Sequence, residues 1–134
     1  MSDEKVRVER SEDFEEVYAN NVRYESSVWD LKMLFGQLDL SRTPPEIIRL
    51  HTGMTVPWTA AKIAAYFMVV NVILHQNANG EIKVPDQVLP PRPDPDSPEL
   101  DNLGKDTVTY LSWVYDQFFG PDPYIPPGVD VGKI

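Results

Sequence analysis

Apolar and polar residues alternate along three stretches in the first half of the chain. Residues 29–40 show the alternation most clearly, and residues 17–26 and 47–56 repeat it. A period of two is typical of strands with one covered and one wetter face. The residues expected to share a face on each strand are Tyr18, Val22 and Tyr24, then Trp29, Leu31, Met33 and Phe35, then Ile48, Leu50, Thr52, Met54 and Val56. The pattern predicts a three-stranded antiparallel sheet, or a four-stranded one if residues 81–85 add a strand.

The periodicity changes at Pro57, a residue that suits the first position of a helix. Residues 60–74 are apolar except for Lys62 and Asn71, and the turn sequence NANG follows shortly afterwards. We therefore predict a helix over residues 57–76 that lies behind the sheet. The change of period indicates an α+β fold.

This helix has almost no polar face. A membrane span is disfavoured, because only eight uninterrupted apolar residues separate Lys62 from Asn71 and about 20 are needed. We expect the helix to be covered by its own sheet on one side and, on the other, by a C-terminal helix or by the same helix of a second copy. A homodimer or higher oligomer follows, in which this helix or the sheet edge is shared, and its predicted interface residues are Ala61, Ala64, Ala65, Val69, Val70 and Ile73.

The remaining chain divides around this core. A cluster of prolines predicts an extended linker over residues 86–97. A Ser-Pro-Glu sequence then predicts the start of a second helix over residues 98–119, and residues 120–134 form an extended tail. Residues 1–15 are predicted to be a disordered acidic arm, and residues 16–85 are the core domain.

Charge and composition narrow the classes of partner. The formal net charge of −9 resides in the two ends of the chain, and residues 17–85 are close to neutral. No basic stripe is present to neutralise phosphates, so we expect no nucleic-acid partner. The absence of cysteine excludes disulfides and thiolate chemistry. With a mixed-charge beginning and no signal-peptide pattern, a cytoplasmic location is expected.

Catalytic signatures are missing from the sequence. The two histidines, His51 and His75, stand alone on a predicted strand and at the end of a predicted helix, where a structural role is the usual one. An acidic run lacks the glycine and glutamate spacing of a calcium loop; its members are Asp94, Asp96, Glu99 and Asp101. The glycines form no phosphate-binding loop, and no serine lies in a nucleophile elbow. We predict no catalytic residue, no metal site, no cofactor and no enzymatic activity.

Three segments carry a family resemblance: VYANNVRYESSVWDLKMLFGQL, VPWTAAKIAAYFMVVNVILHQ and NGEIKVP. They resemble a small prokaryotic family, the domain of unknown function numbered three-four-six-seven. The matching residues are Tyr18, Asn20, Asn21, Asp30, Phe35, Gly36, Gln37, Pro57, Ala61 and Lys62. Val56 departs from the pattern, since a serine or threonine cap is expected before the helix. The resemblance covers about residues 16–85 and implies no activity, because the family has none established.

A second likeness is one of architecture and charge. An acidic, oligomeric protein with strands first and a helix packed behind them is similar to the SecB-type export chaperones. Fold analogy alone does not establish function.

The C-terminal region is rich in large apolar side chains. They either fold back on the chain's own core or anchor a protein partner. The predicted partner-binding residues are Trp113, Phe118, Phe119, Tyr124 and Ile125. We therefore predict a small accessory or adaptor subunit that oligomerises through its core and binds another protein through its C-terminal arm. The alternative is a SecB-like holdase that captures unfolded chains.

Overall fold

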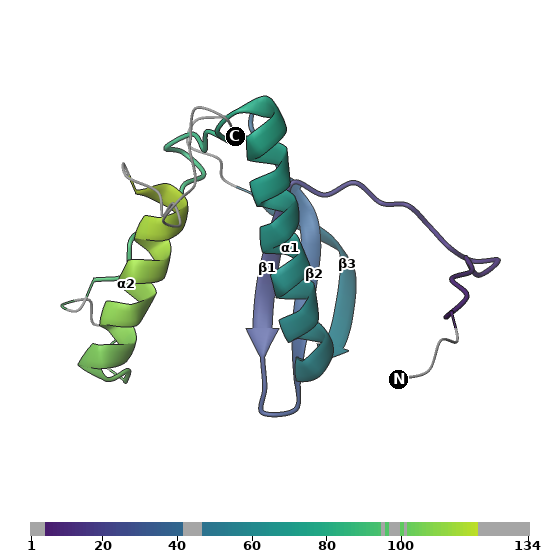
Figure 1. Cartoon of the computed structure of the whole chain (residues 1–134), viewed down its shortest axis with the longest axis horizontal. Coiled ribbons are helices and arrows are strands. Elements are labelled where there is room, and N and C mark those ends of the chain that lie inside the picture. Colours follow the sequence, from purple (N-terminus) through teal and green to yellow (C-terminus); the bar gives the residue numbers. More distant parts are fainter. Residues whose placement is uncertain (1–4, 42–46, 95, 97–99, 101, 121–134) are drawn as a thin grey trace. The chain divides into compact units, whose positions relative to one another are not determined.

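The computed structural model describes residues 5–41, 47–94, 96, 100 and 102–120 (Figure 1). The chain divides into two compact units after Trp58. The first unit contains the strands β1 (Asn21–Ser26), β2 (Asp30–Leu38) and β3 (Ile48–Pro57). The second contains almost all of helix α1 (Trp58–Asn79) and helix α2 (Lys105–Phe119).

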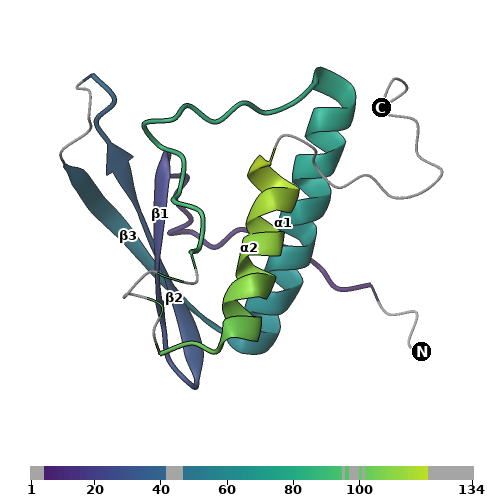
Figure 2. The ribbon, with the colours of Figure 1, turned by 90° about the vertical axis from the view of Figure 1, so that its left-hand side faces the viewer.

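The strands form one antiparallel sheet in the order β1-β2-β3, which confirms the predicted α+β class (Figure 2). β1 and β2 are joined by a tight hairpin, and β3 is the longest strand, with ten residues. Residues 81–85 have no strand pairing, so the four-stranded alternative is wrong.

A β-bulge changes which residues of β3 share a face. Phe35 pairs with Thr52, but the next residue, Gly36, pairs with Leu50, so His51 is the extra residue. Because paired residues lie on the same face of a sheet, the bulge moves Leu50 to the face opposite Thr52. The prediction that all five alternating residues of the third strand share one face is therefore wrong for Ile48 and Leu50.

Gly36 is the residue that the bulge requires. A Cβ atom at this position would lie 2.3 Å from the carbonyl oxygen of Arg49, in the backbone of β3. The close approach of two backbones explains why glycine stands here.

One face of the sheet is predominantly apolar. The register brings Tyr24, Met33 and Met54 into one row across the three strands, and the neighbouring rows are similar in character. The large apolar residues of this face, which we call the apolar sheet face, are Val22, Tyr24, Leu31, Met33, Phe35, Met54 and Val56. The expected grouping of Leu31, Met33 and Phe35 is confirmed.

β1 begins at Asn21, later than the predicted residue 17. The side chain of Asn20 receives a hydrogen bond from Leu38 N and donates one to Leu38 O. The Gln37 amide likewise donates to the carbonyl of Tyr18. These side-chain amides supplement the backbone hydrogen bond from Asn20 N–H to Gly36 O at 3.1 Å, so the chain is held against β2 before the regular pairing of β1 begins.

The hairpin between β1 and β2 is organised by Ser27. Its hydroxyl oxygen accepts hydrogen bonds from the N–H groups of Trp29 and Asp30, each at 3.1 Å. Trp29 thus lies in the turn, 83% exposed, and the prediction that it belongs to the covered face is wrong. The indole Nε1 of Trp58 donates to Ser27 O at 2.9 Å, which ties the end of β3 to this turn.

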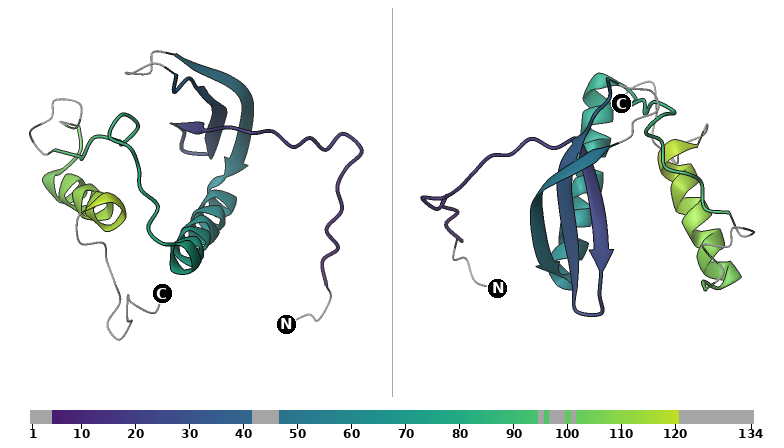
Figure 3. Two further views of the ribbon diagram at one scale, coloured as in Figure 1. Left: turned by 90° about the horizontal axis from the view of Figure 1, so that it is seen from above. Right: turned by 180° about the vertical axis from the view of Figure 1, so that it is seen from behind.

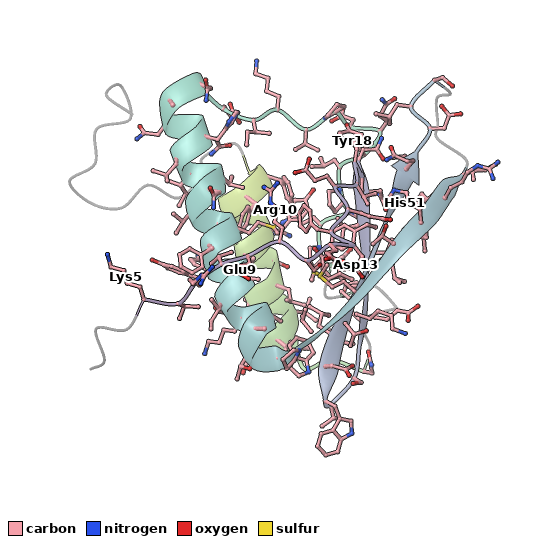
Figure 4. The ribbon with its side chains drawn as sticks, turned by 90° about the vertical axis from the view of Figure 1, so that its right-hand side faces the viewer. Lys5, Glu9, Arg10, Asp13, Tyr18 and His51 are labelled. Atoms are coloured by element: carbon pink, nitrogen blue, oxygen red, sulfur yellow. The ribbon has the colours of Figure 1, made fainter. Side chains whose placement is uncertain are left out.

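The segment before β1 has no helix or strand over residues 5–19 but is locally organised. Figure 4 shows Glu9, Arg10 and Asp13 along this exposed segment. The Arg10 guanidinium lies 4.9 Å from the centre of the Phe14 ring and 3.6 Å from the carboxylate of Glu16. Both contacts are exposed, so they add little stability.

α1 follows β3 without a connecting loop and runs three residues beyond its predicted end. Gly80 has a φ of 91°, and its N–H donates to Gln76 O at 2.9 Å. A glycine in the left-handed conformation is a common way for a helix to end. The polar Asn71 is accommodated by a hydrogen bond from its side chain to Phe67 O at 2.8 Å.

α2 begins at Lys105, seven residues after its predicted start. Gly104 is the N-cap, with Val108 N–H bonded to its carbonyl, and Leu103 N–H closes a separate turn onto Leu100 O. The Ser-Pro-Glu sequence predicted a helix start, but the turn closed by Leu103 lies between that sequence and the first residue of α2. The predicted end at residue 119 is confirmed, and residues 121–134 of the predicted tail lie outside the described residues.

Candidate interaction surfaces

The proline-rich segment is bound along one side of α2. Arg92 makes two parallel hydrogen bonds to Asp116, each 2.9 Å long, from Nε to Oδ1 and from Nη2 to Oδ2. Tyr115 Oη donates to Pro90 O at 2.7 Å, and Ser112 Oγ lies 2.8 Å from Pro93 O. We call this set of contacts the clasp. The predicted linker is not extended throughout, since residues 86–88 form a turn closed by hydrogen bonds from Val88 N–H and Leu89 N–H to Pro85 O, and its later part is attached to the second helix.

The clasp changes the acidity of its ion pair. The hydrogen bond from Arg92 lowers the pKa of Asp116 below its ordinary value, and desolvation opposes this shift. The same hydrogen bond raises the pKa of Arg92 further. Two parallel bonds between a guanidinium and a carboxylate fix geometry as well as charge, so the clasp sets the position of the segment along the helix.

The side of α2 that faces the clasp is its buried side. Val108 is 2% exposed and Ser112 is 7% exposed. One and two turns further on, Tyr115 and Phe119 lie with ring centres 5.0 Å apart. These residues recur at spacings of three and four, as a helix face requires. The clasp therefore gives α2 a small core of its own.

The opposite side of α2 carries an exposed aromatic pair. Tyr110 and Trp113 have ring centres 5.9 Å apart and are 65% and 52% exposed. Of the residues predicted to bind a partner, Trp113 belongs to this pair and Phe119 to the clasp side. Phe118, 50% exposed, lies about 140° around the helix from Trp113 at 100° per residue. The three do not form one patch, and Tyr124 and Ile125 lie outside the described residues.

The residues predicted for the oligomer interface all lie on α1. Ala61, Ala65, Val69 and Ile73 recur every four residues and lie along one side of the helix, but Ala64 and Val70 do not belong to that stripe. Ala61 is buried, whereas Val69 and Ile73 are 39% and 55% exposed. Tyr66, Phe67 and Met68, outside the predicted set, are also exposed.

An open hollow of about 390 Å³ lies in the second unit. It brings together two residues of the predicted oligomer interface, Val69 and Ile73, with two of the predicted partner-binding residues, Phe118 and Phe119. Its other lining residues are Val72, Gln76, Glu81, Ile82, Val84 and Gln117. The lining is mainly apolar, so this hollow is suited to apolar side chains rather than to a charged ligand.

α1 is long and apolar enough to cross a membrane by length and composition alone. A single such helix is weak evidence for a membrane span, because the buried core helix of a soluble protein meets the same criterion; the apolar window of α1, however, is 0% buried. The described elements otherwise are those of a small α+β domain. The prediction of no membrane insertion stays a prediction.

Titratable side chains are dispersed. Within the described ranges, no three histidine, aspartate or glutamate side chains are grouped so as to hold a metal ion. His51 Nδ1 lies 2.8 Å from the Thr52 hydroxyl, and His75 Nδ1 lies 3.4 Å from the Asn79 amide nitrogen. Each histidine is thus placed next to a neutral neighbour on its own element.

Sequence reasoning missed the clasp. Its helix residues could have been found from the spacing of Ser112, Tyr115 and Asp116 on one helix face. Their partners, in an extended proline-rich segment, have no periodic pattern that points to a contact.

Comparison with family models, with curated proteins and with solved structures found no match to any of them.

Proposed function

We propose that this protein is a small, non-enzymatic accessory or adaptor subunit of the cytoplasm. In this proposal it forms a homo-oligomer through its core and binds a protein partner through its C-terminal arm. The core belongs, on the resemblance described above, to the prokaryotic domain-of-unknown-function family numbered three-four-six-seven.

The observation that carries the proposal is the exposed pair Tyr110–Trp113 on a helix whose other side is occupied by the clasp. Because Val108 and Ser112 are already buried, and Ser112 Oγ is bonded to Pro93 O, the helix does not need the aromatic pair for its own packing. Aromatic side chains that remain exposed on an ordered element are the usual anchors of protein interfaces, and a preordered element loses less entropy on binding.

The experiment is affinity purification of the full chain from its native host, with quantification of the co-purified proteins. We expect one stoichiometric partner for the wild type and its loss with Trp113→Ala. Trp29→Ala is the matched control, because Trp29 is also exposed but lies in the other unit, in the turn between β1 and β2. Retention of the partner by Trp113→Ala, or its loss with Trp29→Ala alone, would contradict the proposed arm.

The second candidate is a SecB-like holdase. It is favoured by a different observation, the exposure of Tyr66, Phe67 and Met68, which are 63%, 56% and 60% exposed on α1. Exposed apolar surface of this kind can capture unfolded chains. A holdase suppresses the aggregation of several unrelated heat-denatured proteins, whereas an adaptor suppresses none of them and retains its single partner.

A further inference from the structure

The sheet has one blunted edge and one open edge. β3 contains the bulge at His51 and ends in Pro57, which has no N–H to donate. β1 has neither glycine nor proline nor a bulge, and within the described part of the chain no strand pairs with its outer side. The segment before β1 runs toward the β3 side of the sheet, away from this edge (Figures 1 and 3). An open edge of this kind is a template for another strand.

Hydrogen bonding in the hairpin determines which groups of β1 point outward. Ser27 N–H donates to Asp30 O at 3.0 Å, in the same register as the β1–β2 ladder, so this position has the orientation of a hydrogen-bonded pair, although Asp30 N–H bonds to Ser27 Oγ instead of the carbonyl. Such pairs recur at every second residue, which directs the backbone groups of Glu25 and Arg23 toward β2. The alternate residues turn their N–H and C=O groups to the open edge: Val22, Tyr24 and Ser26.

The charges on β1 select one register for pairing with a second copy. A two-fold axis pairs identical strands antiparallel, and only registers that join outward-facing residues can form the ladder. With the axis at Tyr24, Val22 of each copy is paired with Ser26 of the other copy. Arg23 of each copy is likewise paired with Glu25 of the other copy, so each pair occurs twice. With the axis moved to Arg23 or to Glu25, identical charges meet on the axis and repel.

We propose that two copies of this chain pair through β1, antiparallel and about a two-fold axis at Tyr24, to form one continuous six-stranded sheet. This inference names the surface for the oligomerisation in the proposed function and rests on that part of it. The partner is a second copy because the strand is complementary to itself in charge and in hydrogen-bonding phase.

Two further observations support this pairing. Glu25 lies 3.9 Å from Lys32 across β1 and β2, whereas Arg23 has no ion-pair partner among the described residues. In the dimer, Glu25 stands between Lys32 and Arg23 of the second copy, so each acid has a base on either side. Tyr24 is 57% exposed and belongs to the apolar sheet face. In the dimer, the Tyr24 side chains of the two copies lie side by side on the axis, so the apolar sheet faces of the two copies become continuous.

The first test exchanges the charges and measures the dissociation constant of the full chain by sedimentation. Arg23→Glu leaves only acids at the paired positions, and Glu25→Arg leaves only bases. Each is expected to weaken the homodimer at least about tenfold, because two attractive pairs become two repulsive ones. The double variant Arg23→Glu/Glu25→Arg is expected to recover the wild-type dimer. A mixture of the two single variants is expected to form a heterodimer.

The second test maps the axis. The chain has no cysteine, so single introduced cysteines report directly on distance. Tyr24→Cys is expected to crosslink to itself under mild oxidation, because paired Cα atoms lie within the disulfide range of roughly 4.4–6.8 Å. Val22→Cys, which pairs with position 26 of the second copy, is the control and is expected to remain monomeric on a non-reducing gel.

A wild type that remains monomeric at all micromolar concentrations overturns this inference, as does an oligomer that none of the charge variants weakens. Val69→Asp separates the two surfaces, because it disrupts an oligomer formed through α1 and leaves β1 pairing intact. Loss of a stoichiometric partner with Trp113→Ala reports only on the arm. If the partner is still bound by a monomeric wild type, the β1 inference fails and the adaptor proposal stands.

Discussion

The side-chain amide of Asn20 is bonded to the backbone of Leu38 in both directions, with 2.6 Å from Leu38 N to Oδ1 and 3.0 Å from Nδ2 to Leu38 O. An asparagine side chain thus takes the place of one residue of β1 at the end of β2. The two consecutive asparagines therefore have different roles. Asn20 bonds through its side chain, whereas Asn21 is the first residue of the strand and its Oδ1 has no hydrogen-bond partner in the described residues.

Asn20→Ala is expected to destabilise the protein by about 1–2 kcal/mol, because two exposed hydrogen bonds are lost together. Asn21→Ala is the matched control, and we expect it to cost less, because it removes an unsatisfied oxygen. Urea denaturation of the full-length variants measures both. Equal losses at the two positions would show that the Asn20 amide has no special part in the sheet.

Gly36→Ala is expected to destabilise the protein by about 2 kcal/mol or more, because the new Cβ would lie 2.3 Å from Arg49 O and one backbone must move. Gly53→Ala tests the same chemical change on the neighbouring strand, where the nearest atom is Leu34 Cδ2 at 3.5 Å. That variant is expected to fold with nearly unchanged stability. Thermal denaturation of the two proteins provides the comparison, and a harmless Gly36→Ala would contradict the bulge geometry.

Trp58→Phe removes the indole donor that reaches Ser27 O at 2.9 Å and retains an aromatic ring. We expect a loss of about 1 kcal/mol and faster amide exchange at the β1–β2 turn. Trp29→Phe, in a side chain that is 83% exposed, is expected to change neither quantity. Hydrogen exchange followed by NMR distinguishes the two variants, and an identical response from both would rule out the tie between Trp58 and the turn.

The clasp is expected to loosen in acid. Because the pKa of Asp116 is lowered by its hydrogen bond from Arg92, the carboxylate contributes stability that is complete above its ordinary pKa and is lost as the pH falls through the lowered value. The pKa of Arg92 is raised and has no influence in this window. A carboxyl ¹³C titration of Asp116 measures the effect.

Arg92→Gln is the variant for that titration. Removing the guanidinium is expected to return the pKa of Asp116 toward its ordinary range and to leave the α2 helix formed, since Ser112 and Tyr115 still bind the proline-rich segment. Superimposable titration curves for the wild type and Arg92→Gln would mean that the ion pair does not form in solution.

Local sequence pattern determined the elements of this protein. Alternation predicted β2 and the face shared by Leu31, Met33 and Phe35, because a strand has a fixed two-residue period. The change of pattern at Pro57 located the start of α1 to within one residue. The end of α2 followed from Gly120, since glycine often follows the last helical residue.

Tertiary structure decided what no local pattern contains. The bulge at His51 is a property of two strands in register, so the sequence of β3 alone placed Leu50 on the wrong face. The late start of β1 depends on Asn20 meeting Leu38, and the clasp depends on Arg92 meeting Asp116, 24 residues away. Such contacts join residues distant in the chain, and their partners are determined by packing and hydrogen-bond geometry, which no local pattern encodes.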